Sequence, residues 1–307
     1  MGMRTLRRRI AELVGKVNGR MGVAVHDTAT GEEIGVAQDD LFPMASVCKT
    51  PILVTAYRQV DAGRLSLDER LEITDATRVA GSGLLNFFDT GLRPTLRDLL
   101  LLMIVVSDNA ATDLILNAVG GPEQVTREMR HLGLTNIRLD RNIAGLLKDI
   151  HVAIDPVAAD LDFHGLRSLL ETDDDLATRF RDADRGFEAV REATAGRDVA
   201  SPADIARLYV QAARGECAGS ESCEAILKTL ERQQLRGRLP RNLPPNTRCC
   251  HKTGTLGNGN VTNDTGLIYI GERAVAVAVL SREVRQDPAA TNTVIARIGR
   301  MAYDELQ

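Results

Sequence analysis

The sequence contains no tryptophan, and aromatic residues of all kinds make up only 3% of its 307 residues. It also lacks a strong charge bias. The formal net charge of -4 at pH 7 gives no overall case for binding nucleic acid or an anionic membrane. Hydrophobic and charged residues make up 44% and 26% of the chain, as is typical of a globular protein with a sizeable core. This length suits one large domain or two interleaved ones.

Long apolar runs are absent as well. The longest one, residues 99–106, is far too short to span a bilayer. The N-terminus is basic, but no continuous apolar stretch and no small-residue cleavage site follow it, so no signal peptide is predicted. Two expectations therefore stay open: the protein remains inside the cell, or the sequence begins after a removed leader.

Cysteine is scarce, and its spacing is not that of a disulfide framework. An odd count without paired spacing favours free thiols over structural disulfides. The five residues are Cys48, Cys217, Cys223, Cys249 and Cys250. Only Cys217 and Cys223 are placed to form a local bridge. The CCH sequence at 249–251 matches no standard zinc site, so neither a metal nor a cofactor is predicted.

Hydrophobic periodicity predicts strands at both ends of the chain and helices between them. Residues alternate as in half-buried strands over 21–27, 31–38, 265–271 and 274–281. Helical spacing is found over 4–17, 46–62, 95–106, 109–120, 121–133, 201–216 and 291–306. In the helix over 201–216, Ser201 is a natural cap and Pro202 suits the first helical position.

This order of elements predicts an α/β fold. Residues 1–45 and 235–307 are expected to form a discontinuous α/β domain, whose antiparallel sheet is flanked by the terminal helices. Residues 46–234 are expected to form a mostly α-helical domain, with a cleft between the two parts as the natural place for a site. The charged stretch at about 162–198 keeps helical spacing and is predicted to be an inserted surface helix or lid.

Three short motifs carry the chemistry. Ser46 and Lys49 stand one helical turn apart, so a hydroxyl and an amine share one face, as a nucleophile and its base require. A helix cap beside a solvated lysine would look the same. Ser107 and Asn109 follow an apolar helix, and Lys252 begins a Lys-Thr-Gly sequence at the end of a predicted strand. Together, in this order, the motifs are typical of class A β-lactamases and penicillin-binding proteins.

On these residues the chain resembles the serine β-lactamases of class A. The likeness also includes GSGLL at 81–85, RLDR at 138–141, SPADIARL at 201–208 and ND at 263–264, and it covers most of the chain outside the charged stretch. The resemblance implies a five-stranded antiparallel sheet and a serine hydrolase that forms a covalent acyl-enzyme. It also implies a small-molecule β-lactam, amide or ester as the substrate.

The resemblance further assigns a role to each matching residue. Ser46 is expected to be the nucleophile and Lys49 its base, while Ser107 passes a proton between the lysines and the leaving nitrogen. Burial and the second cation, Lys252, are expected to lower the pKa of Lys49. Substrate-binding roles fall to Asn109, Thr253, Gly254 and Thr255: an amide contact, a carboxylate contact, a close backbone approach and an oxyanion donor, respectively. Lys252 is expected to share the carboxylate.

The sequence departs from the family pattern at one place. Class A enzymes carry a glutamate two residues after the RLDR-like segment, where it activates the water that releases the acyl-enzyme. Here Ile143 occupies that position. Nearby polar candidates are Asp140, Asp149, His151 and Asp155, and a neutral Lys49 could act in both half-reactions.

Three hypotheses follow from this departure. The first is a β-lactam hydrolase with a relocated base. The second is a serine amidase, peptidase or esterase acting on another substrate. The third is a slowly deacylating sensor or sink. Arg141 is expected to close the loop by pairing with Asp155 or Asp162. The charged stretch is left open as a lid, a dimer contact or a specificity wall.

Overall fold

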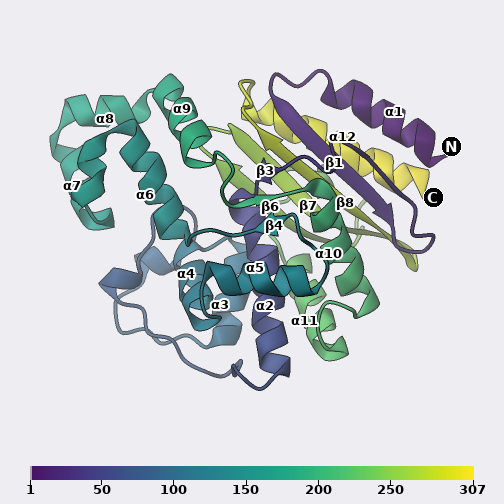
Figure 1. The fold of residues 1–307 in the computed structure, drawn as a ribbon, viewed down its shortest axis with the longest axis horizontal. Coiled ribbons are helices and arrows are strands. Elements are labelled where there is room, and N and C mark those ends of the chain that lie inside the picture. The colour runs from purple at the N-terminus through teal and green to yellow at the C-terminus, as the bar shows by residue number, and fades with distance from the viewer. Residues whose placement is uncertain (1) are drawn as a thin grey trace.

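The computed structural model describes residues 2–307 and shows a five-stranded antiparallel sheet with helices on both faces (Figure 1). In spatial order the strands are β2 (Glu33–Val36), β1 (Arg20–Asp27), β8 (Arg273–Arg282), β7 (Val261–Ile270) and β6 (Cys249–Leu256). N-terminal and C-terminal strands pair directly, with Val25 opposite Val277. The predicted α/β class and the shared sheet are confirmed.

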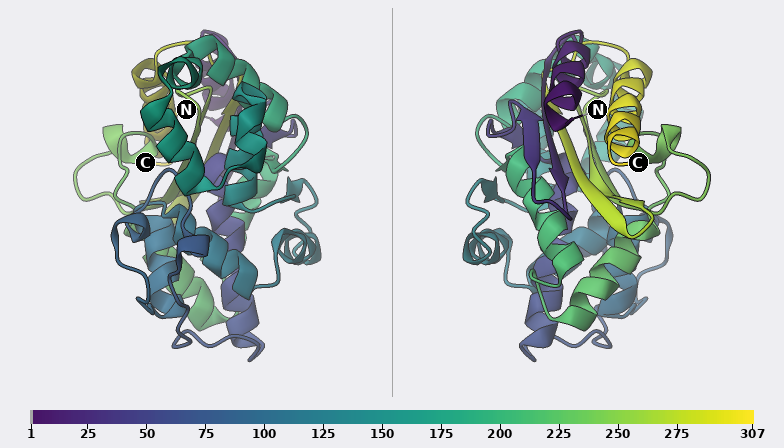
Figure 2. Two further views of the ribbon diagram at one scale, coloured as in Figure 1. Left: turned by 90° about the vertical axis from the view of Figure 1, so that its left-hand side faces the viewer. Right: turned by 90° about the vertical axis from the view of Figure 1, so that its right-hand side faces the viewer.

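The two terminal helices, α1 (Met3–Val14) and α12 (Pro288–Glu305), lie side by side on one face of the sheet (Figure 2). Leu6 and Ile10 of α1 are buried with Ile295 and Ile298 of α12 in the core beneath them. Both helices were predicted from the periodicity of their apolar residues. Among the described residues, no helix is both long and apolar enough to pass through a membrane.

The other face of the sheet is covered by α10 (Pro202–Arg214), and four further helices gather around α2 (Lys49–Asp61). The others are α3 (Leu96–Val105), α4 (Asn109–Ala118), α5 (Pro122–His131) and α11 (Ser220–Glu231). As predicted, Ser201 caps α10 by accepting a hydrogen bond from the amide of Asp204, with Pro202 at the first position. The predicted domain division at residues 45 and 234 stays a prediction.

A smaller sheet joins three distant parts of the chain. It consists of β3 (Phe42–Pro43), β5 (Val199–Ala200) and β4 (Ile137–Arg138), in that order. Strands of two residues are too short to show alternation in the sequence, so none of them was predicted. Helix α11 was not predicted either. The five cysteines all lie within the described residues as buried free thiols, with the Sγ atoms of Cys217 and Cys223 3.5 Å apart.

Residues 142–197 form an insertion lobe of four helices at one end of the molecule (Figure 1). These are α6 (Ile143–Ile154), α7 (Phe163–Thr172), α8 (Asp174–Arg181) and α9 (Ala183–Ala193), with a short 3-10 turn at Pro156–Asp160. The lobe is therefore larger than the predicted insertion and begins about 20 residues earlier. Its first helix was missed because α6 is apolar, whereas charge marked the rest.

Candidate active site

Ser46 stands on a tight turn that leads into α2. A 3-10 turn, Ala45–Cys48, holds the serine, and the α-helix itself begins at Lys49. The preceding residue, Ala45, has φ 48°, a left-handed conformation that costs a non-glycine residue energy. From Phe42 to Tyr57 every residue is buried except Ser46. The fold therefore exposes one hydroxyl from an otherwise buried segment.

Strand β6 passes directly beside this turn. A Cβ atom at Gly254 would lie 2.8 Å from the carbonyl oxygen of Met44 and 3.1 Å from the amide nitrogens of Ser46 and Val47. Only glycine leaves room for this approach. Asn263, opposite Gly254 on β7, also ties the sheet to the turn, because its side-chain amide donates to the carbonyl oxygens of Pro43 and Met44.

Two lysine ammonium groups meet at one hydroxyl. Lys49 Nζ and Lys252 Nζ each donate to Ser107 Oγ over 3.1 Å, from α2 and from β6. Lys49 also donates to the carbonyl oxygen of Ser107 over 2.7 Å and to Asn109 Oδ1 over 2.8 Å. Lys252 also donates to the carbonyl oxygen of Thr253. The three predicted motifs therefore lie together in space.

Burial weakens the basicity of both amines. Neither lysine is exposed, and loss of hydration lowers the pKa of Lys49 to about 8. The pKa of Lys252 falls well below its ordinary value, first through burial and then through the charge of Lys49. The charge of Lys252 was expected to contribute to lowering the pKa of Lys49. Its pKa is instead lowered by burial alone, while Asp108 and Asp113 oppose the shift.

The turn that carries Ser107 is fixed by the side chain of Asp108. Ser107 has φ 59°, and Asp108 caps α4 by accepting from the amide of Ala111. The second carboxylate oxygen of Asp108 accepts from the amides of Leu84 and Leu85, so this side chain orders its own turn. Asp108, and not Asn109, is the cap of α4. Asn109 is thereby free to hold Lys49.

A cavity of about 440 Å³ opens over these groups. Of the predicted site residues, six line it: Ser46, Ser107, Asn109, Thr253, Gly254 and Thr255. Lys49 and Lys252 are fully buried beneath the hydroxyl of Ser107 that they share. The arrangement can support attack by a serine on a carbonyl carbon, with two amines available to move protons.

One cation beside the cavity was not predicted. Arg238 Nη2 donates to Thr255 Oγ1 over 2.6 Å, and Nη1 donates to the carbonyl oxygens of Gly254 and Asn263. Its guanidinium therefore lies against the Lys-Thr-Gly strand, at the end nearest Thr255. Nothing in the sequence distinguished Arg238 from Arg236 or Arg241. Its position depends on the path of the connection between α11 and β6, which no local pattern specifies.

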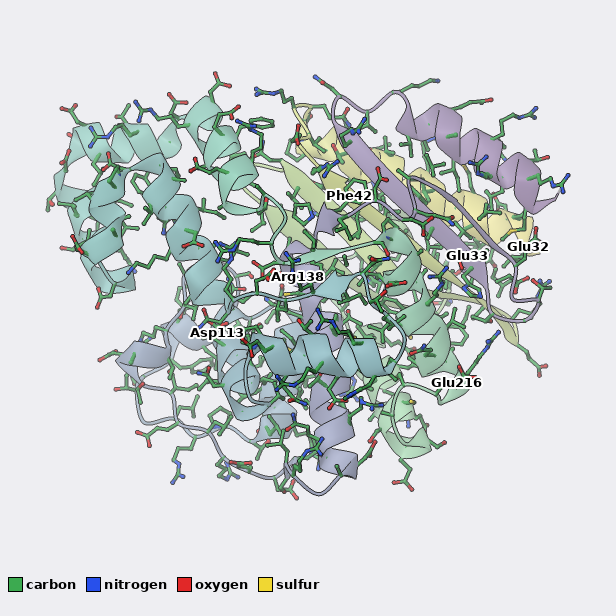
Figure 3. All side chains as sticks on the ribbon, in the orientation of Figure 1. Glu32, Glu33, Phe42, Asp113, Arg138 and Glu216 are labelled. Carbon is green, nitrogen blue, oxygen red and sulfur yellow. The ribbon has the colours of Figure 1, made fainter. Side chains whose placement is uncertain are left out.

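Ile143 is the first residue of α6, and its side chain lines the cavity. Asp113 on α4 fixes this helix start by accepting from the amides of Ile143 and Ala144 over 2.8 and 2.9 Å. Figure 3 labels Asp113 where α4 meets this part of the lobe. An apolar side chain therefore stands where a carboxylate was sought.

The polar candidates near Ile143 have other partners. Asp140 accepts from the amide of Asp198, Asp149 pairs with Arg141 and Arg197, and Asp155 pairs with Arg179 over 2.8 Å. Of these candidates only His151 lines the cavity, and burial lowers its pKa.

The neck of the lobe is closed by Asp198. This carboxylate accepts from the amides of Asp140 and Arg141 and from Arg141 Nε, the last over 2.6 Å. Arg141 also donates to Asp149 and to the carbonyl oxygen of Ala193. The expected pairing of Arg141 with Asp155 or Asp162 was wrong. The loop closes on a residue 57 positions later in the chain, at the C-terminal end of the charged stretch.

Known proteins are similar to this chain in sequence and in fold. A model of the β-lactamase enzyme family matches residues 5–306. The chain belongs to the β-lactamase enzyme family. As a family member it is a serine hydrolase, in agreement with the resemblance inferred from its motifs.

Individual β-lactamases match either the whole chain or a part of it. VEB-1 of Pseudomonas aeruginosa is 24% identical over 94% of this chain and 85% of its own length. The L2 enzyme of Stenotrophomonas maltophilia is 37% identical over 43% of each chain, so this match spans less than half of that relative.

Solved structures match over nearly the full length. An ancestral class A β-lactamase is 28% identical, with 97% of this chain and 99% of the other covered and a TM-score of 0.77. A β-lactamase from Sphaerobacter thermophilus is 27% identical, with 98% and 97% covered and a TM-score of 0.76. The structure of PBP-A shares the fold at 23% identity and a TM-score of 0.78, with 99% and 96% covered.

Proposed function

We propose that this family member attacks the amide of a β-lactam with Ser46 and forms a covalent acyl-enzyme. The observation that carries the proposal is the shared Ser107 hydroxyl, which two buried lysines contact over 3.1 Å beneath the cavity that holds Ser46. The Ser46 Oγ–carbon bond forms as the lactam carbon–nitrogen bond breaks. The serine proton passes by way of Lys49 and Ser107 to the departing nitrogen.

Lys49 is the base in this proposal. With a pKa near 8, about a tenth of the amine is neutral at pH 7. As an ammonium it donates to three acceptors, two on Ser107 and one on Asn109. A neutral amine has only two N–H groups, so releasing one of these contacts frees its lone pair for the proton of Ser46.

The remaining groups bind substrate. The amides of Ser46 and Thr255 would stabilise the oxyanion, aided by the positive end of α2. Lys252, Thr253 and Arg238 would attract the substrate carboxylate at the β6 side of the cavity. On the other side, Asn109 would hydrogen-bond the side-chain amide, and Gly254 would let the substrate backbone lie flat against the strand.

Release of the acyl group is the slow step in this proposal. Ile143 can neither hold nor deprotonate a water molecule, and the nearby aspartates are engaged in ion pairs or backbone contacts. Lys49 is then the base for both half-reactions. The same chemistry on a different amide or ester is the second candidate, favoured by the absence of that carboxylate. A sink that stays acylated is the third.

One experiment separates these candidates. The protein is mixed with a chromogenic cephalosporin, and colour and intact mass are followed over time. A Ser46 adduct that forms fast and decays slowly, with continuing colour, supports the proposal. A permanent adduct supports the third candidate, a protein that stays acylated. If neither colour nor an adduct appears, the second candidate, a different amide or ester substrate, is supported. Ser46→Ala should abolish both signals, whereas Cys48→Ser, a matched change in the same motif, should keep them. Hydrolysis that survives Ser46→Ala would overturn the mechanism.

A further inference from the structure

The cavity over Ser46 extends along the insertion lobe. Apolar side chains line this extension, which we call the acyl groove: Ile143, Leu146, Leu147, Ile150, Ile154 and Phe180. All but Phe180 are on α6, at spacings of three and four residues. They therefore form one face of the helix, which extends about 16 Å from the first to the last of them.

Part of this wall stays open to solvent, although Leu147 packs on the helical core and Ile154 on the apolar cluster between α6 and α9. Leu146 and Ile150 are buried against Ala189 and Val190 of α9, so they also hold the lobe together. Leu147, Ile154 and Phe180 are only half-buried although they face the cavity. An apolar group bound there would remove their remaining surface from water, which is favourable in proportion to the area covered.

Charge is distributed unevenly between the two sides of the cavity. Lys252 and Arg238 lie at the β6 side, beneath and beside the Lys-Thr-Gly strand. Along α6 the lining side chains are mostly apolar, and among the described residues no lysine or arginine lines the cavity; its polar lining includes His151, Asp182, Asn258 and Asn260. His151 is kept neutral at pH 7 by burial, which lowers its pKa, and Asp182 is exposed at the cap of α9. The groove therefore suits an uncharged chain.

The α6 face that lines the acyl groove is fixed at both of its ends by contacts with other helices. Asp113 fixes the start of α6 through two backbone amides, and Asp155 near its end pairs with Arg179 of α8. The rings of His151 and Phe180 lie 5.8 Å apart and link the same two helices. A groove formed before binding loses little entropy when a ligand enters it.

We propose that the acyl groove binds a long, unbranched apolar acyl group attached to the amide nitrogen of the substrate. This inference rests on the proposed function, since it uses the acyl-enzyme at Ser46. With the carboxylate held at the β6 side and the side-chain amide at Asn109, the acyl chain leaves the site towards Ile143 and follows α6. The substrate class is thus an N-acylated β-lactam or amide with a lipid-like tail.

A homologous series tests this proposal. The second-order rate constant for acylation of Ser46 is measured by intact mass with N-acyl derivatives of 6-aminopenicillanic acid, from acetyl to dodecanoyl, below the concentrations at which they form micelles. We expect the rate constant to rise about two- to fourfold per methylene until the groove is filled, as burial of each methylene predicts.

Variants along the groove locate the chain. Leu147→Ala should reduce the gain for medium and long chains, whereas Ile154→Ser, near the far end, should affect only the longest. Phe180→Ala should make the acylation rate constant nearly independent of chain length, and Phe180→Leu should keep most of the dependence on chain length. Val157→Ala, an exposed apolar residue of the lobe that does not line the cavity, is the matched control and should leave the series unchanged. A general loss of stability would not produce this dependence on chain length.

The outcomes separate the two proposals. If acetyl and long-chain derivatives react equally fast, or if the variants leave the series unchanged, the groove does not bind the chain, while the function at Ser46 stands. If no derivative of the series, short or long, forms a Ser46 adduct, the proposed function itself fails. A preference for acyl groups that end in an amine, lost in Asp182→Asn, would assign the groove to a peptide and overturn the apolar proposal.

Discussion

The reaction centre and the insertion lobe are stabilised in opposite ways. At the centre, charged groups are fully buried, and each is positioned by hydrogen bonds from two or three elements, as at Ser107. In the lobe the charges lie mostly at the surface, and α8 buries only Leu176. The comparison teaches that the buried polar cluster and the apolar wall of the cavity come from different parts of this chain. In our proposals the centre supplies the reactivity, and the lobe supplies the wall that the substrate meets.

The largest effect should come from the centre. Replacing Lys49 with methionine removes the base, so the rate constant for acylation should fall by about 10²- to 10⁴-fold. Mass spectrometry of the Ser46 adduct measures it. Lys148→Met, at an exposed lysine of α6, is the control and should change little. A loss of less than tenfold in Lys49→Met would show that another group takes the serine proton.

The neck of the lobe should show the largest effect on folding. Arg141 and Asp198 have side chains that are each only 8% exposed. Arg141→Met leaves a buried carboxylate unpaired and should lower the free energy of unfolding by about 3–5 kcal/mol, measured by urea denaturation. Arg197→Met removes an exposed partner of Asp149 and should cost less than about 1 kcal/mol. Equal losses in the two variants would mean that the neck does not hold the lobe.

A carboxylate placed where the two regions meet should change the second half-reaction. Ile143→Glu introduces a base on the cavity wall and should speed loss of the Ser46 adduct by about 10²-fold. Ala144→Glu adds the same charge one residue later, at an exposed side chain that does not line this cavity, and should have no such effect. Adduct lifetime by intact mass is the measurement, and equal lifetimes in the two variants would place the acyl-enzyme away from Ile143.

The pH dependence should report on the centre alone. Because neutral Lys49 is the active form and its pKa is about 8, the acylation rate constant should rise about tenfold between pH 6 and 7 and level off above about 8. A profile that is flat from pH 6 to 8 would exclude Lys49 as the base.

The smallest effect should come from the outer surface of the lobe. Arg167 and Glu171 on α7 are 69% and 64% exposed and form an ion pair across one helical turn. Arg167→Ala should lower the free energy of unfolding by less than about 0.5 kcal/mol, because water screens this pair. Urea denaturation of Arg167→Ala and Arg141→Met in parallel compares their free energies of unfolding directly. A loss above about 1 kcal/mol in Arg167→Ala would mean that the outer ion pairs support the lobe.

The sequence by itself determined the fold class and predicted the reactive groups. Residue periodicity predicted the paired strands, β1 with β2 and β7 with β8. Along β8 the residues alternate between two buried faces of the sheet, each covered by helices. Ser46, Lys49, Ser107, Asn109 and Lys252 were predicted because their three motifs, in this order, are typical of class A β-lactamases and penicillin-binding proteins. These signals are local: each depends on residue types within one turn of helix or one strand.

Only the tertiary structure decided what surrounds those groups. The pairing of Arg141 with Asp198, the approach of Arg238 to Thr255 and the placement of α6 along the cavity all join segments that are distant in sequence. Periodicity shows that α6 has an apolar face but not what that face meets. Its contacts depend on how the chain closes at the neck, and closure over 57 residues leaves no local pattern in the sequence.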